Sequence, residues 1–153
     1  MTLKFPQSNI PFEPNPRYFI GGFDVYDREE SLGAQLNGFD PNDAAQAQYL
    51  LDKYIFPRFT SVRGYTAEHR KALADALLSV LSDRDYCFDA LLEDNHNECF
   101  YLPSDWKIRD PREFFLQVYQ AVVRHWHIEL ESVGVELPKA DDLTANKSFK
   151  RTR

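Results

Sequence analysis

The sequence predicts a mainly α-helical fold, an irregular helical bundle around a central buried helix at about residues 110–132. Asp110, Pro111 and Glu113 supply the start signal, because Asp caps a helix, Pro suits its first position and Glu completes the capping pattern. Most of the following residues are apolar, and the polar ones recur at spacings of three and four along one narrow stripe. These polar residues are Glu113, Gln117, Gln120, Arg124, His127 and Glu131. A helix with so little polar surface has to be covered by other elements.

Shorter helical segments can supply this cover. Helix start signals occur at Asp27, at Asp43 and at Thr66. They predict helices over residues 28–37, 44–56 and 67–81, and a further helix is expected over residues 84–92. Pro57 would stop the second of these, because proline cannot continue a helix without losing a hydrogen bond.

The two ends of the chain differ from its helical middle. Residues 1–16 carry four prolines, which remove hydrogen-bond donors and fix φ, so they predict an extended Pro-rich arm laid over the domain. Residues 17–138 are expected to form a single helical domain, and residues 139–153, which end in Lys and Arg, a flexible basic tail. Within the domain, residues 18–25 and 98–102 are rich in aromatic and β-branched side chains and could pair as a small two-stranded β element.

Composition and charge exclude several classes of function. The chain of 153 residues is long enough for one domain with a sizeable core. Its formal net charge of −6 repels phosphate backbones and anionic membranes, so neither a nucleic acid nor a membrane is expected as a partner. No apolar run reaches the length of a signal-peptide core or a membrane span, which predicts a soluble, cytoplasmic protein. Cys87 and Cys99 are too few for a disulfide framework and agree with a reducing compartment.

Two groups of residues have side chains that metals bind. Cys87, His96 and Cys99 are suitable ligand types, but structural zinc usually takes four ligands from paired motifs, so ordinary cysteines are the preferred interpretation. The second group is His125, His127, Glu129 and Glu131. On a strand these side chains would share one face, whereas on a helix they diverge, and the start signal at Asp110 favours a helix.

Motifs that carry catalysis are missing from the sequence. It has no Gly-x-Ser-x-Gly elbow, no phosphate-binding Gly-x-x-x-x-Gly-Lys loop and no His-Glu-x-x-His. Arg63 and His69 have a spacing found in some helical ribonucleases, but that spacing is common by chance and no basic surface accompanies it. We therefore expect no catalytic residue, no cofactor and no metal, and a protein that is not an enzyme.

Carboxylates and aromatic residues are concentrated in residues 83–106. Arg84 is the only Lys or Arg between residues 83 and 98. An acidic rim steers a basic partner and aromatic anchors slow its release, so this stretch predicts a partner-binding surface; the alternative is a solvated helix face followed by core aromatics. The candidate residues are Asp83, Asp85, Tyr86, Asp89, Glu93, Asp94, Glu98, Tyr101 and Trp106.

These observations together favour a small acidic protein that acts by binding another protein. The expected partner is basic and could be a toxin domain, because bacterial immunity proteins and antitoxin-like inhibitors share this profile of size, charge and missing motifs. One alternative is a metal-dependent enzyme that uses the histidine and carboxylate residues. Another is a structural or regulatory subunit that makes its contacts through the Pro-rich arm and the basic tail.

Overall fold

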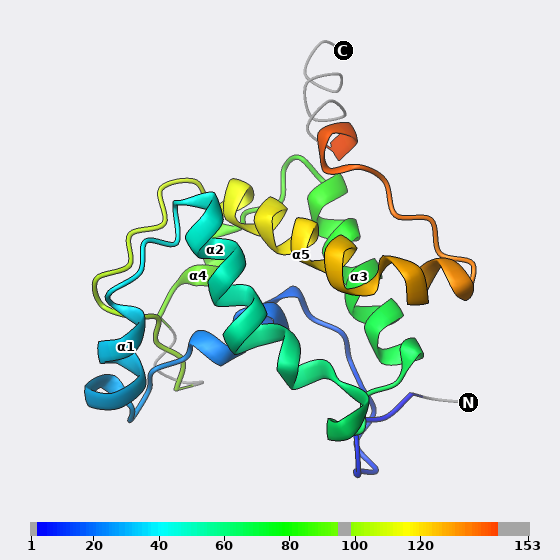
Figure 1. Cartoon of the computed structure of the whole chain (residues 1–153), viewed down its shortest axis with the longest axis horizontal. Helices are drawn as coiled ribbons and strands as arrows, with labels where there is room; N and C mark the ends of the chain where they lie inside the picture. Colours follow the sequence, from blue (N-terminus) through cyan, green and yellow to red (C-terminus); the bar gives the residue numbers. More distant parts are fainter. Residues whose placement is uncertain (1–2, 95–98, 144–153) are drawn as a thin grey trace.

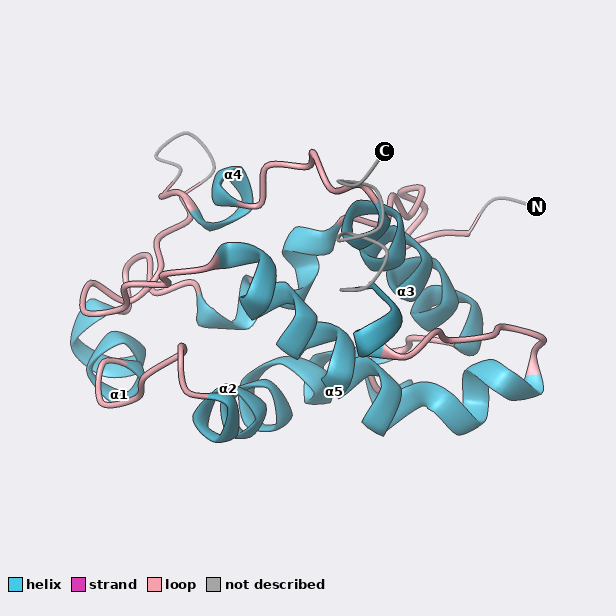
Figure 2. Cartoon of the chain, turned by 90° about the horizontal axis from the view of Figure 1, so that it is seen from above, coloured by secondary structure: helices cyan, strands magenta, loops and turns pink. Residues whose placement is uncertain are grey.

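The central helix organises the structure. The computed structural model of the protein describes residues 3–94 and 99–143, and it confirms the mainly α-helical prediction. Helix α5 (Pro111–Ser132) runs through the middle of the molecule, with α2 (Ala44–Leu50) packed on one side and α3 (Ala67–Ser82) on the other (Figure 1; Figure 2). None of the helices in the described part of the chain is both long enough and apolar enough to cross a bilayer.

Helix α5 begins where the sequence predicts. The Asp110 carboxylate accepts a hydrogen bond from the backbone N–H of Glu113 at 3.1 Å, and Pro111 occupies the first turn. The side chains that α5 buries come from most of its circumference: Phe114, Phe115, Leu116, Val118, Tyr119, Ala121, Val122, Trp126 and Leu130. Ile128 is the exception, since it is 74% exposed. Packing of these nine side chains explains why the helix is stable at this position.

The two flanking helices also begin at their predicted caps. Thr66 and His69 form a reciprocal capping box at the start of α3, in which each side chain accepts a hydrogen bond from the other's backbone N–H. Asp43 caps α2 through the backbone N–H of Gln46 at 3.0 Å. The regular α-helix ends at Leu50, earlier than the predicted residue 56, and the chain continues through the wider turns of η4 (Leu51–Ile55) and the 3₁₀ turn η5 (Phe56–Phe59), which contains Pro57.

Two predicted helices are shorter or less regular than the sequence indicates. Residues 28–37 form η3 (Glu29–Gly33), a wide π-type turn, followed by α1 (Ala34–Leu36). Residues 84–92 are helical only in α4 (Asp89–Leu92). The reason lies at Asp83, whose carboxylate accepts from the N–H of Asp85 and whose carbonyl accepts from the N–H of Tyr86. This local turn competes with helix formation until residue 88.

The strand expected over residues 18–25 is wrong. The chain there forms two 3₁₀ turns, η1 (Pro16–Phe19) and η2 (Gly21–Phe23), because Asn15 caps the first turn through the N–H of Arg17. A single backbone hydrogen bond, from Val25 to the carbonyl of Tyr101, joins this segment to the other predicted strand. No strand forms in residues 3–94 and 99–143; the β structure recorded there is limited to isolated bridging residues.

The N-terminal arm packs against α3 and folds back on itself. Lys4 and Pro11 form an antiparallel bridge, and the N–H of Phe12 donates to the carbonyl of Leu3 at 2.8 Å. Phe12 is buried and meets the ring of His69 edge-on. Because Nδ1 of His69 already accepts from the helix cap, Nε2 carries the proton and donates to the carbonyl of Lys4 at 2.6 Å. The arm is therefore part of the packed domain.

The chain after α5 also returns to the core. The Tyr119 hydroxyl donates to the carbonyl of Pro138, and burial raises the pKa of Tyr119 to about 12. Leu143 is only 3% exposed, so packing extends past residue 138, the predicted end of the helical domain. The remaining residues of the predicted basic tail, 144–153, lie outside the described residues.

The missing side chain of Gly22 lets η2 lie close to the backbone of η4, and substituting this glycine tests that contact. A Cβ at this position would overlap with the backbone carbonyl oxygen of Tyr54, which cannot move independently of η4. We expect Gly22→Ala to lower the free energy of unfolding by about 2–3 kcal/mol, measured by urea denaturation. Gly38→Ala is the matched control, since its Cβ would lie at an ordinary 3.7 Å from the Gln35 carbonyl oxygen. Equal effects of the two substitutions would contradict this account.

Candidate functional site

The acidic stretch lies on the surface around α4 and the loop that leads to α5. Its described carboxylates are all exposed: Asp83, Asp85, Asp89, Glu93 and Asp94. Arg84 is half-buried, and Glu98 lies outside the described residues. The charge that this surface presents to solvent is therefore mainly negative.

Some of these carboxylates surround a hollow, which we call the acidic hollow. It has a volume of about 310 Å³ and lies between α4 and the segment 102–111. Asp89, Glu93 and Asp94 line it together with apolar and small residues, namely Leu92, Leu102, Pro103, Ser104, Trp106, Ile108 and Pro111. The hollow thus combines negative charge with an apolar lining.

One hydrogen bond attaches the acidic rim to the segment opposite it. Asp94 accepts from the backbone N–H of Leu102 at 3.2 Å. Arg112, which follows this segment, donates to the backbone carbonyls of Leu81 and Asp83 rather than to a rim carboxylate. Within the described ranges, no ion pair involves Asp89, Glu93 or Asp94.

The aromatic members of the predicted surface serve mainly as core. Trp106 is 8% exposed, its indole N–H donates to the carbonyl of Leu36 at 2.8 Å, and its ring packs edge-on against Phe23. Tyr101 stacks on Tyr26 with ring centroids 5.5 Å apart. Tyr86 packs edge-on against Phe88. These rings support the acidic rim from below instead of projecting from it.

The cysteine group does not assemble within the described residues. Cys87 and Cys99 are both free and exposed, and His96 lies outside the described ranges. No group of three His, Cys, Asp or Glu side chains in residues 3–94 and 99–143 has a geometry that could hold a metal ion.

In the predicted Arg63–His69 pair, His69 has a structural role. His69 is buried, and its two ring nitrogens hydrogen-bond to Thr66 and to the carbonyl of Lys4. A general base needs an accessible ring nitrogen near the substrate, and neither nitrogen of His69 meets that condition.

The second histidine group lies on a helix, as the start signal predicted, and its side chains diverge. Nδ1 of His127 bonds back to the carbonyl of Val123, and Glu131 is exposed. His125 and Glu129, one turn apart, line a second hollow of about 460 Å³ together with Asp52 and Arg70. We call this the histidine hollow. Asp52 and Arg70 are distant in sequence, and no spacing pattern could have assigned them to this group.

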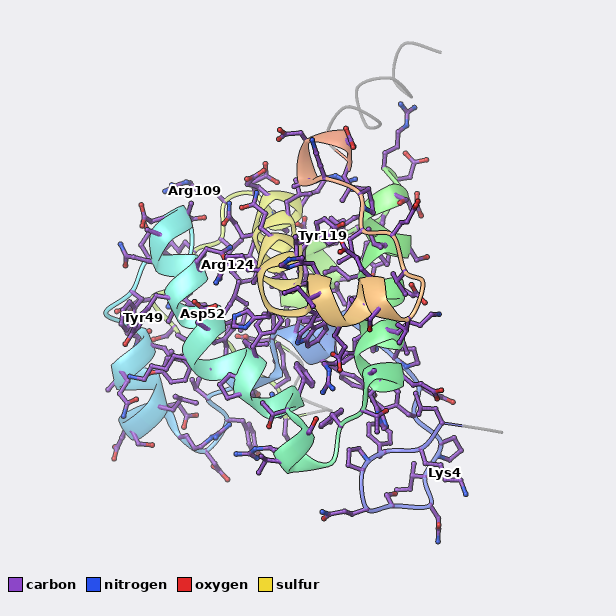
Figure 3. The ribbon with its side chains drawn as sticks, turned by 45° about the vertical axis from the view of Figure 1, so that its right-hand side comes forward. Lys4, Tyr49, Asp52, Arg109, Tyr119 and Arg124 are labelled. Carbon is purple, nitrogen blue, oxygen red and sulfur yellow. The ribbon has the colours of Figure 1, made fainter. Side chains whose placement is uncertain are left out.

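Asp52 joins α5 to η4. Its Oδ1 accepts from Arg124 at 2.8 Å and lies 2.7 Å from Nε2 of His125 (Figure 3). Burial alone would raise the pKa of Asp52, but the hydrogen bonds from Arg124 and His125 outweigh it, so the pKa lies below its usual value. The imidazole of His125 also stacks on Phe56, with ring centroids 4.4 Å apart.

Glu129 joins α5 to α3 through Arg70. The guanidinium donates from Nε at 2.6 Å and from Nη2 at 2.8 Å, one bond to each carboxylate oxygen, and from Nη1 to the carbonyl of Phe59. The Arg70 side chain is 8% exposed and that of Glu129 is 36% exposed. Each Glu129 oxygen and the Nε2 atom of His125 thus already have a partner. We interpret the histidine hollow as the place where two ionic contacts fix α5 to its neighbours.

The Arg70–Glu129 pair predicts a pH-dependent contribution to stability. The hydrogen bonds from Arg70 hold the pKa of Glu129 below its usual value, even though burial acts in the opposite direction. The folded protein therefore binds fewer protons at this site than the unfolded chain. The stabilisation is complete above the unfolded pKa of about 4.3 and is lost as the pH falls through the lower, folded value.

We expect Glu129→Gln to destabilise the protein by about 1–3 kcal/mol at neutral pH, because it leaves a buried guanidinium without its anion while solvent partly screens the pair. The difference from the unmodified protein should shrink steadily below about pH 4, where Glu129 itself becomes protonated. Urea unfolding between neutral and acidic pH measures both effects. Glu131→Gln, an exposed position on the same helix, is the control and should change neither quantity. A pH-independent difference would contradict the assignment.

Trp106 gives a further prediction, which tests whether its side chain belongs to the core or to the surface. Trp106→Ala should lower the free energy of unfolding by about 3–5 kcal/mol, because it empties a core site and leaves the Leu36 carbonyl without its indole donor. Thermal unfolding followed by circular dichroism measures the change. A variant of unchanged stability would show that Trp106 acts as a surface side chain.

Comparison with known proteins finds no match: no protein-family model, no curated protein and no solved structure matches this chain. The role of the acidic surface has to be argued from its own geometry and charge. Three features of this surface are relevant: its acidic rim, its apolar lining, and the absence of ion pairs at Asp89, Glu93 and Asp94 within the described residues.

Proposed function

We propose that the protein acts by binding a basic protein partner through the acidic surface around α4 and residues 93–106. The observation that carries this proposal is the composition of the acidic hollow. Asp89, Glu93 and Asp94 stand at its rim, and its lining contains neither Lys nor Arg among the described residues. Carboxylates without a cation nearby can interact more favourably with a cation that a partner supplies.

The lining suits the side chain of a lysine or an arginine. Such a side chain has an apolar stem and a charged end, and it is best accommodated where its stem can lie on apolar surface while its end meets an acceptor. Leu92, Leu102 and Ile108 offer the apolar surface, and the rim carboxylates offer the acceptors. A volume of about 310 Å³ is sufficient for one such side chain.

The most concrete form of this function is inhibition of the immunity or antitoxin type. An inhibitor of that type covers a basic site on its partner, and its association is accelerated by opposite charge. The hydrogen bond from Leu102 to Asp94 supports such a role, because that side chain is already ordered before binding. The proposed partner is therefore a protein with a basic functional surface, such as a toxin domain.

The test compares two triple variants that change the net charge equally. One neutralises the rim, and the other neutralises exposed carboxylates elsewhere. They are Asp89→Asn with Glu93→Gln and Asp94→Asn, and Glu13→Gln with Glu30→Gln and Glu136→Gln. The amide at position 94 can still accept the hydrogen bond from Leu102, so the rim variant should fold normally.

Affinity capture from a cell extract identifies the partner, and surface plasmon resonance then measures its binding to each variant. We expect the rim variant to lose about tenfold in association rate at low ionic strength and to lose most of its salt dependence. The control variant should bind like the unmodified protein. A captured partner that binds both variants equally, or that is itself acidic, would refute the proposal.

A further inference from the structure

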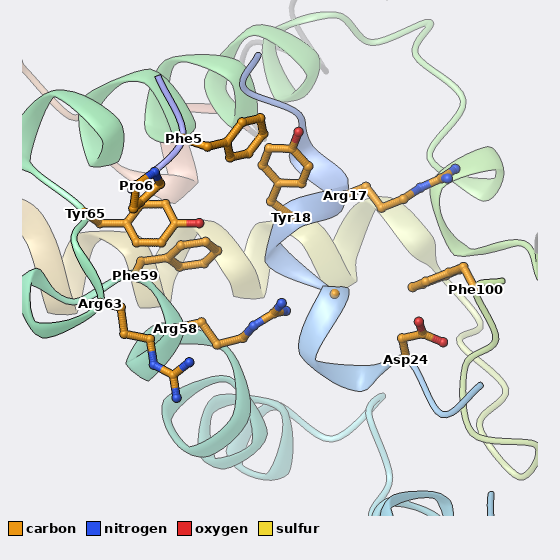
Figure 4. A pocket seen from close by; sticks show the side chains of 11 residues that line it. Phe5, Pro6, Arg17, Tyr18, Asp24, Arg58, Phe59, Arg63, Tyr65 and Phe100 are labelled. Carbon is orange, nitrogen blue, oxygen red and sulfur yellow. The ribbon is translucent and has the colours of Figure 1, made fainter. Parts of the chain in front are cut away.

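We propose that a second surface, the arginine hollow, binds a small organic anion in which a phosphate group is attached to a planar ring. This hollow has a volume of about 550 Å³ and lies between the N-terminal arm, η1, η2 and the segment 58–65 (Figure 4). The lining residues on which the argument depends are Tyr18, Gly21, Arg58, Phe59, Arg63 and Tyr65. This inference is independent of the protein-binding function proposed above.

Positive charge gathers in this hollow although the protein as a whole is acidic. Arg58 and Arg63 lie on one wall, and Arg17 lies on the opposite wall (Figure 4). Arg17 donates to the carbonyl of Ala90, and its guanidinium lies over the ring of Phe100. No ion pair joins Arg58 or Arg63 to a carboxylate within residues 3–94 and 99–143. An anion bound here would meet the guanidinium groups of Arg58 and Arg63, which no carboxylate of the described residues neutralises.

Arg58 is held where an anion could reach it. Burial lowers the pKa of Arg58, and the nearby charges of Arg63 and Arg28 lower it further, while Tyr65 and Asp24 act in the opposite direction. An arginine nevertheless remains charged at neutral pH, and Arg58 is exposed. It can therefore meet a bound oxyanion, because a guanidinium can donate two parallel hydrogen bonds to a phosphate or a carboxylate.

Among the described residues, Asp24 is the one carboxylate that lines the hollow, and it already bonds to the backbone. Oδ1 of Asp24 accepts from the N–H groups of Tyr26 and Tyr101, each at 3.0 Å. Those two bonds stabilise the negative charge of Asp24 without using an arginine. Asp24 therefore reduces the positive potential of the hollow only in part.

Gly21 determines the position of the Arg58 guanidinium. A Cβ on Gly21 would lie only 2.7 Å from Nη1 of Arg58, so the absence of a side chain gives the guanidinium its room against η2. The sequence showed Gly21 and Gly22 only as a pair of adjacent glycines. In the structure, Gly21 leaves room for the Arg58 guanidinium, and Gly22 leaves room for the backbone of η4.

Aromatic rings supply the surface for a planar group. Phe5, Tyr18, Phe59, Tyr65 and Phe100 all line the hollow, and Phe59 meets Tyr65 edge-on at 5.3 Å between centroids. Burial raises the pKa of Tyr18, and Glu13 and Tyr65 add to the effect, so its hydroxyl stays protonated and can donate to an anion. Aromatic side chains can pack against the planar ring of a ligand, while neighbouring arginines bind the oxyanion attached to that ring.

The test uses phenyl phosphate and adenosine 5′-monophosphate as probes, with phenol, adenosine and inorganic phosphate as their separate halves. Isothermal titration calorimetry should give a Kd below about 1 mM for at least one ring phosphate, and at least tenfold weaker binding for each half. Two results would overturn the proposal: neither ring phosphate binds, or inorganic phosphate binds as tightly as the ring phosphates.

Substitutions then locate the binding site. Arg58→Gln should weaken binding about 10- to 100-fold, because it removes charge-assisted hydrogen bonds, and Arg58→Lys should have an intermediate effect. Arg109→Gln, an exposed arginine that does not line the hollow, is the matched control and should bind normally. A thermal unfolding scan of each variant confirms that it is folded. Binding that is insensitive to Arg58 in folded protein would overturn the assignment. The rim variant of the acidic hollow should still bind these probes, so failure of one proposal leaves the other intact.

Discussion

The large apolar surface of α5, which nine buried side chains form on several sides of the helix, is the constraint on which the rest of the structure depends. A helix with so narrow a polar stripe is stable only if other elements cover most of its circumference, and no single neighbour can do this. Helices α2 and α3 cover two sides, and short turns with aromatic side chains fill what remains. Trp126 of α5, for example, meets Phe19 of η1 and Phe56 and Phe59 of η5. Short elements with large rings can follow the curved surface of a helix that long elements would leave partly open.

The same burial distributes the charges of the protein. Polar side chains on α5 have to find partners on the covering elements, and Arg70–Glu129 and Arg124–Asp52 satisfy this requirement by joining opposite charges. The carboxylates near α4 and the arginines near η1 are not on α5. They therefore do not have to pair with charges on the elements that cover α5. They accumulate as two patches of opposite sign, which the net charge of −6 conceals.

Much of the fold could be predicted from the sequence where a signal acts over a few residues. The caps at Asp110 and Thr66 bond to groups three positions away, so the local sequence contains the whole interaction. The strand predicted over 18–25 does not form, because the equally local cap at Asn15 starts a 3₁₀ turn there instead. The acidic rim could be foreseen because its members are close together in the chain. The arginine hollow could not, since its lining comes from residues 5–24, residues 58–65 and Phe100, which are far apart along the chain.

The acidic hollow and the arginine hollow are both lined by one short segment, residues 100–102, which we call the wall between them. Phe100 lines the arginine hollow and Leu102 lines the acidic hollow, with Tyr101 between them. Tyr101 donates its N–H to Asp24 and accepts at its carbonyl from Val25, so the backbone at the centre of the wall is fixed to the N-terminal turns. A ligand on one side can change affinity on the other only if it prefers one of two arrangements of the structure between them. A wall held in this way favours one arrangement. Occupants of the two hollows would therefore interact through their charges, and that interaction would weaken as salt is added.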